Sequence, residues 1–174
     1  VCIMAFTKSL NDFYGKLVTA YPSLGVKGNS WLADFPAINC SLPLINNTDL
    51  DIVTDEEMEK KADETPNEFD FLGKSIDTGF RISRNSNLNF MTICPHLAYA
   101  LAKSIDNQET TKISGIELRF NGIQSFKGVV NDGNFPVLGI STYKDTKIKK
   151  TDELESKLQG RKWDLVSREI VEYL

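Results

Sequence analysis

The sequence predicts a mixed α+β fold, in which helices pack against a sheet. Apolar residues at helical spacing alternate with short β-rich runs along the 174-residue chain. Hydrophobic residues make up 41% of the chain and charged residues 25%, which is the balance of an ordinary globular protein with a buried core. The length fits one domain rather than two.

The first 40 residues predict a strand, a helix and an extended segment. Residues 1–6, VCIMAF, are typical of the end of a strand that begins upstream, so N-terminal strands are expected before Val1. Residues 9–21 predict a helix, because apolar residues recur at helical spacing and a proline follows. Residues 24–40 predict a long extended segment that Pro36 bends or leaves at a sheet edge.

Residues 45–68 form an acidic insertion. From Asp49 to Glu68 the chain has nine acidic residues and two lysines. This composition predicts a surface loop, with a helix over residues 55–64 that begins at acidic residues. The loop is either a solvated insertion or a segment that regulates the protein or binds a basic partner.

The rest of the chain predicts three more strands, one strand pair and several helices. Asn121-Gly122 is a strong hairpin signal, which predicts two short strands within residues 116–130. Gly160 is a candidate break in the C-terminal helical pattern. The other expected elements are a strand at 69–72, a helix at 75–84, a strand at 87–94, a helix from Pro95, a strand at 135–143 and one or two helices within 152–174.

Charge and cysteine content exclude several classes of function. The net charge of −4 at pH 7 provides no basic field for nucleic acid or an anionic membrane surface. No apolar run reaches the roughly 20 residues that span a bilayer. Three widely spaced cysteines fit a reducing, cytoplasmic setting. The single histidine, His96, is expected at a helix start without a catalytic role, and a Cys/His metal cluster is not expected.

Residues 70–81, DFLGKSIDTGFR, place charged side chains in an apolar stretch. Asp77 and Arg81 are four residues apart, so on a helix they share one face. They are either a surface ion pair of little energetic weight or part of a site in a cleft or interface. Gly79 weakens the helix and would make sense where another group approaches closely.

The spacing of Asp70, Gly73, Asp77 and Arg81 resembles the signature of class III nucleotidyl cyclases, the adenylate and guanylate cyclase family. LGVKGNSWLADF, NFMTICPHLAYALA, SFKGV and FPVLGIS resemble other parts of the same domain in the family's order. The resemblance covers residues 1–143 and leaves 144–174 as a C-terminal helical extension. It implies a ferredoxin-like domain, with a mixed, mostly antiparallel sheet and helices on one face.

The resemblance also implies roles for four residues. Asp70 would contact the base, Asp77 the ribose or base edge, and Arg81 the α-phosphate in the transition state. Lys127 would bind the triphosphate, although it could equally be a solvated hairpin lysine. The family usually has Asn where this chain has Asp77, and an ionised Asp cannot donate a hydrogen bond. The role of that position is therefore open.

By the same resemblance, the chain would convert a nucleoside triphosphate to a 3′,5′-cyclic nucleotide and pyrophosphate. The family uses Mg²⁺ or Mn²⁺ held by two Asp residues, which we expect upstream of Val1, and its sites form between the subunits of a homodimer. The acidic insertion and the Trp31–Pro36 segment resemble the pyrimidine cyclases of anti-phage Pycsar systems, which implies CTP or UTP as substrate. The alternative is an inactive cyclase-fold nucleotide sensor or dimerisation partner.

Overall fold

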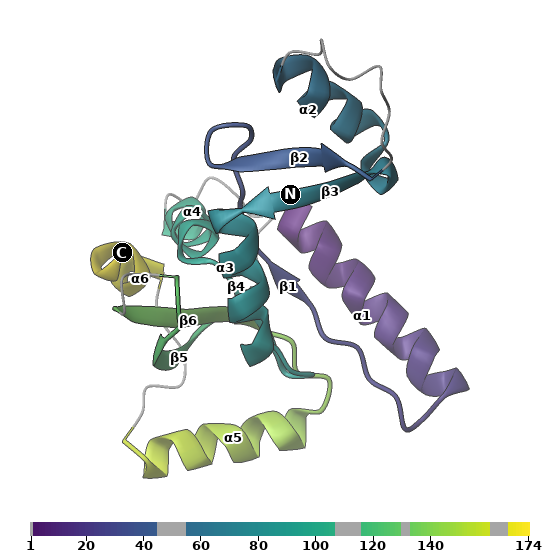
Figure 1. Cartoon of the computed structure of the whole chain (residues 1–174). Helices are drawn as coiled ribbons and strands as arrows, with labels where there is room; N and C mark the ends of the chain where they lie inside the picture. Colours follow the sequence, from purple (N-terminus) through teal and green to yellow (C-terminus); the bar gives the residue numbers. More distant parts are fainter. Residues whose placement is uncertain (1, 45–54, 107–115, 130–132, 161–166) are drawn as a thin grey trace. The chain divides into compact units, whose positions relative to one another are not determined.

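The computed structural model describes residues 2–44, 55–106, 116–129, 133–160 and 167–174. The fold is mixed α+β, as the sequence predicts, with one four-stranded and one two-stranded sheet among these residues (Figure 1). The chain forms two compact units. The larger unit contains Val1–Trp31 and Ile82–Leu174, and the smaller unit contains Leu32–Arg81. The division into 1–143 and 144–174 stays a prediction.

The larger unit is built on the four-stranded sheet, in the order β1-β4-β6-β5. β1 runs parallel to β4, and the β4–β6 and β6–β5 pairs are antiparallel, so the sheet is mixed and mostly antiparallel. The strands are β1 (Asn29–Ser30), β4 (Phe90–Ile93), β5 (Leu118–Ser125) and β6 (Asn134–Ser141).

One face of this sheet carries the main core. Met91 and Ile93 of β4 and Leu138 and Ile140 of β6 alternate along their strands and are almost completely buried. They pack with buried residues from three helices, α1 (Cys2–Ala20), α4 (Pro95–Asp106) and α6 (Ser167–Tyr173). Phe90 and Arg119 lie on the other face of the sheet, outside this core, and contact each other.

Helix α5 (Thr146–Leu158) differs from the other helices of the larger unit, because none of its residues is buried. The Asp145 side chain accepts the N–H of Lys147 and caps its first turn. Gly160 follows with φ +67, which agrees with the predicted helix break. Residues 161–166 lie outside the described residues.

The structure corrects two predictions for the N-terminal region. Residues 2–6 do not form a strand, because Cys2–Ala20 is one continuous helix. Ile3 and Met4 pack against the core together with Leu10, so the helical period of the following residues extends back to the start and overrides the local strand propensity. The extended segment predicted at 24–40 is not continuous, because a turn at 35–38 separates β1 from β2 (Asn39–Pro43). This turn contains Pro36, where the sequence predicts a bend or a sheet edge.

The predicted hairpin at Asn121-Gly122 is wrong as well. β5 continues through both residues and pairs with β6 at Phe120 and again at Ile123, with a register shift between them. Gly122 has φ +90. The same tolerance for left-handed backbone that favours Asn-Gly in turns here accommodates a bulge within one strand.

The smaller unit is organised around the antiparallel pair of β2 and β3 (Phe69–Gly73). The predicted helix at 55–64 is confirmed as α2 (Asp55–Glu64), while 45–54 of the acidic insertion lies outside the described residues. The Ser41 hydroxyl donates to the Glu59 carboxylate at 2.7 Å and links β2 to α2. The unit also contains the 3₁₀ turn η2 (Pro66–Glu68) and α3 (Lys74–Ile82), whose last residue is assigned to the larger unit, where the 3₁₀ turn η3 (Ser83–Asn85) follows.

Across these described ranges, no helix is both long enough and apolar enough to cross a membrane.

Candidate functional site

The predicted strand–glycine–helix unit is present at β3 and α3. Gly73 ends β3 with φ +147, and an added Cβ would lie 2.4 Å from Asn39 Oδ1 and 2.6 Å from the Ile38 carbonyl oxygen. Asn39 Oδ1 accepts the N–H groups of Ser75 at 3.1 Å and Ile76 at 3.4 Å. A side chain from β2 thus satisfies the first turn of α3, and the turn requires glycine.

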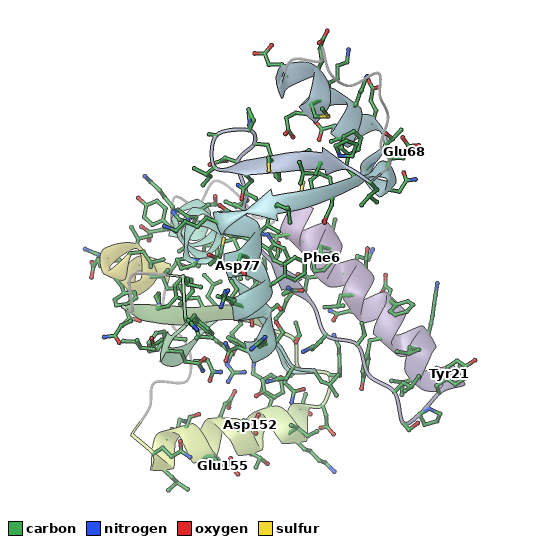
Figure 2. The ribbon with its side chains drawn as sticks, in the orientation of Figure 1. Phe6, Tyr21, Glu68, Asp77, Asp152 and Glu155 are labelled. Carbon is green, nitrogen blue, oxygen red and sulfur yellow. The ribbon has the colours of Figure 1, made fainter. Side chains whose placement is uncertain are left out.

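Asp77 and Arg81 are brought together on α3, as their spacing predicts. Arg81 Nε donates to Asp77 Oδ2 at 2.7 Å, and 37% of the Arg81 and 52% of the Asp77 side chain are exposed. Figure 2 shows Asp77 on this helix. An exposed i,i+4 pair of this kind contributes at most about 1 kcal/mol to stability. Both side chains are accessible to a ligand.

The other two predicted site residues lie on other elements of the chain. Asp70 is exposed on β3 opposite Leu42, and its Oδ1 accepts the N–H of Phe71 at 2.9 Å. Lys127 is exposed in the turn that follows β5 and belongs to the larger unit, whereas Asp70, Asp77 and Arg81 belong to the smaller unit. Of the four residues, Asp77 and Arg81 are in direct contact.

Among the described residues, no three Cys, His, Asp or Glu side chains form a group that could hold a metal ion. His96 is exposed in the first turn of α4, next to Pro95, as the sequence predicts.

A second polar cluster, in the larger unit, was not predicted. Its centre is Arg119 of β5, on the sheet face opposite the core that Leu118 helps to form. The guanidinium carbon Cζ lies 5.6 Å from the ring centroid of Phe90 and 5.3 Å from that of Tyr143. Arg119 Nη1 also donates to Tyr143 Oη at 3.1 Å. These contacts fix the position of a partly buried cation.

Tyr143 connects this cation to helix α5. Its hydroxyl donates to the Asp152 carboxylate while it accepts from Arg119. Burial, and then the hydrogen bond to Asp152, raise the pKa of Tyr143 to about 12. The phenol is therefore neutral at physiological pH and bridges one positive and one negative group.

The cluster forms part of the wall of a cavity of about 420 Å³, which is within the usual size range of small-molecule sites. Phe90 reaches the wall because Gly139 of β6 has no side chain: a Cβ there would lie 2.4 Å from the Phe90 ring. The lining residues are Asn87, Leu88, Asn89, Phe90, Arg119, Asn121, Tyr143 and Asp152.

One sequence signal could have identified this cluster. In IELRF, residues 116–120, an arginine stands between apolar residues of a β pattern. A charged side chain in such a strand points away from the face that its neighbours bury. The partners Tyr143 and Asp152 lie 24 and 33 positions further along the chain, beyond the reach of any local pattern.

Comparison with family models, curated proteins and solved structures gives no match to this chain.

Proposed function

We propose that this chain is the catalytic domain of a nucleotidyl cyclase. It converts a nucleoside triphosphate to a 3′,5′-cyclic monophosphate and pyrophosphate, and the Pycsar resemblance favours CTP or UTP and a second messenger in anti-phage defence. The observation that carries the proposal is the 2.7 Å pair of Asp77 and Arg81 on α3, directly after the Gly73 turn. The strand β3, the glycine turn and the helix α3 follow one another in the order of the cyclase signature.

The geometry of this pair suits phosphate and ribose binding. Arg81 uses Nε for Asp77, and a guanidinium has further N–H donors on Nη1 and Nη2 that match phosphate oxygens. Donors fixed in this way stabilise the charge that develops on an α-phosphate as the 3′-oxygen attacks it. Asp77 Oδ1 is an acceptor suited to a ribose hydroxyl. The contribution of the ion pair to catalysis would thus exceed its small contribution to stability.

The two remaining residues complete the proposed site. Asp70 is an exposed carboxylate that would accept hydrogen bonds from a base edge, and Lys127 is an exposed point charge suited to the β- and γ-phosphates. In a head-to-tail homodimer, a site at the interface would take residues from both copies. The dimer and these two roles rest on the family resemblance.

The test is incubation of the protein with ATP, GTP, CTP or UTP and Mn²⁺, followed by chromatographic separation of cyclic products. We expect cyclic CMP or cyclic UMP, and loss of about 10²–10³-fold in rate for Arg81→Ala. Arg168→Ala is a matched control, because Arg168 Nε and Glu172 Oε1 form another exposed i,i+4 pair, at 3.0 Å on α6. That variant should keep full activity.

Calorimetric titration with each triphosphate separates the proposal from its alternative. Binding that is weakened by Arg81→Ala, without any cyclic product or pyrophosphate, would support a nucleotide sensor or dimerisation partner. Absence of both binding and turnover would refute both functions. An active wild type whose Arg81→Ala variant retains the full rate would refute the role of Arg81 alone.

A further inference from the structure

The cavity at Arg119 carries both signs of charge on one wall. Arg119 supplies a guanidinium and Asp152 a carboxylate, and the single oxygen of Tyr143 lies between them. The charged lining residues therefore sum to zero. An anion attracted by Arg119 is repelled by Asp152, and a cation meets the reverse situation. A ligand that carries both charges on neighbouring atoms avoids this conflict.

The cation is positioned before any ligand arrives. The rings of Phe90 and Tyr143 contact the guanidinium, and Phe90 itself is buried, with 3% of its surface exposed. A guanidinium held through ring contacts directs its N–H edge at a planar acceptor, and a carboxylate is the group that fits this edge best. Little side-chain entropy is lost on binding, because the contacts within the protein already restrict Arg119.

The other lining residues suit a small polar molecule with an aliphatic part. Asn87, Asn89 and Asn121 offer amide groups, each of which is both donor and acceptor. Asn87 Oδ1 accepts the N–H of Asn89 at 2.8 Å, which orders this loop at the wall of the cavity. Leu88 and Phe90 provide apolar surface for carbon atoms.

We propose that this cavity binds a small zwitterion of the α-amino-acid class, with its carboxylate on Arg119 and its ammonium group on Asp152. The site uses none of the residues assigned to the cyclase reaction, so it is a second and independent binding site. The neutral Tyr143 hydroxyl holds the two charged groups at a fixed spacing, and the three asparagines contact the remainder of the ligand.

Thermal-shift and calorimetric measurements with the twenty free amino acids test the proposal directly. We expect at least one to bind, and its N-acetyl and carboxamide derivatives to bind at least about tenfold more weakly, since each lacks one of the two charges. Failure of all twenty to bind at millimolar concentration would overturn the proposal. Equal binding of a free amino acid and its two blocked derivatives would overturn it as well.

Two substitutions test whether Asp152 binds the ammonium group of the ligand. Asp152→Asn removes the negative charge from the cavity, so the variant should lose its preference for the free amino acid over the N-acetyl form. Glu155→Gln is the matched control, because Glu155 is exposed on the same helix and does not line the cavity. It should bind as the wild type does. Equal loss in both variants would contradict the contact between Asp152 and the ammonium group.

Amide NMR spectra then locate the ligand and check the fold. The side-chain amide signals of Asn87, Asn89 and Asn121 should shift on addition of the binding amino acid, while signals from α2 in the smaller unit remain unchanged. Shifts confined to residues outside the cavity lining would overturn the assignment. The same spectra show whether Asp152→Asn keeps the wild-type fold, and Tyr143→Phe, which retains the ring, provides a second variant if it does not.

Discussion

Asn39 Oδ1 accepts the backbone N–H of Ser75 at 3.1 Å, so a residue of β2 caps a helix that begins 35 positions later. Asn39 is only 3% exposed, and its Nδ2 donates to the Asp34 carbonyl oxygen at 2.8 Å. Every polar atom of this side chain has a partner. The side chain therefore positions the helix that carries Asp77 and Arg81.

Replacement of Asn39 by Ala should lower the free energy of unfolding by about 1–3 kcal/mol, because partly buried backbone donors in α3 and the Asp34 carbonyl lose their partner. Urea unfolding monitored by circular dichroism measures the change. Asn11→Ala, at an exposed position of α1, is the control and should change stability by no more than about 0.5 kcal/mol. Equal effects of the two variants would show that the cap contributes nothing.

Two glycine substitutions should change stability in opposite directions. Gly139→Ala places a Cβ 2.4 Å from the Phe90 ring and 2.6 Å from the Met91 carbonyl oxygen, so it should destabilise the protein by about 1–3 kcal/mol. Gly15→Ala, within α1, meets no atom within 4 Å and should stabilise by up to about 1 kcal/mol. Thermal unfolding of both variants tests the pair. A stable Gly139→Ala protein would disprove the close contact with Phe90.

Ionisation of Tyr143 should make the protein less stable at high pH. Its folded-state pKa of about 12 lies above the ordinary value of 10.0. The contribution of the neutral Tyr143 phenol to the stability of the fold is therefore fully present below pH 10 and is lost as the pH rises toward 12. The free energy of unfolding should fall more steeply over this window in the wild type than in Tyr143→Phe. Phenolate absorbance should show a titration with a pKa of about 12, and persistence of that titration in Tyr143→Phe would assign it to another residue.

Helix α5 should detach more readily than the other helices of the larger unit. No residue of α5 is buried, and its contacts with the residues beside β5 and β6 include the Lys149–Glu117 ion pair and the Asp152–Tyr143 hydrogen bond. Hydrogen exchange of its amides should accelerate in Asp152→Asn and Glu117→Gln, and with added salt, which screens such partly exposed pairs. α4, with three buried residues, should exchange slowly under all these conditions. Unchanged exchange in α5 would contradict this view.

Elements with local signals could be predicted closely. The acidic start of α2 and the glycine before α3 lie within a few residues of the helices that they begin, and both helices are where the sequence places them. The proximity of Asp77 and Arg81 follows from helical periodicity alone. These predictions required no knowledge of the tertiary structure.

The errors occurred where distant residues decide the outcome. VCIMAF has the composition of a strand, but Ile3 packs on a sheet formed by residues far along the chain. Asn121-Gly122 fits a turn or a bulge equally well, and its pairing with β6 selects the bulge. The Arg119 cluster depends on Phe90, Tyr143 and Asp152, which come from separate parts of the sequence. Local patterns contain no information on such contacts.

The glycine at position 139 can help to identify relatives of this protein. Gly139 never touches a ligand, yet the aromatic wall of the cavity depends on it. Any larger residue at this position would displace the Phe90 ring from beneath Arg119. A chain that shares the cavity should therefore combine an aromatic residue, an arginine and a glycine at the positions of Phe90, Arg119 and Gly139. That combination across three adjacent strands would be a recognisable mark of common descent even where overall sequence similarity has been lost.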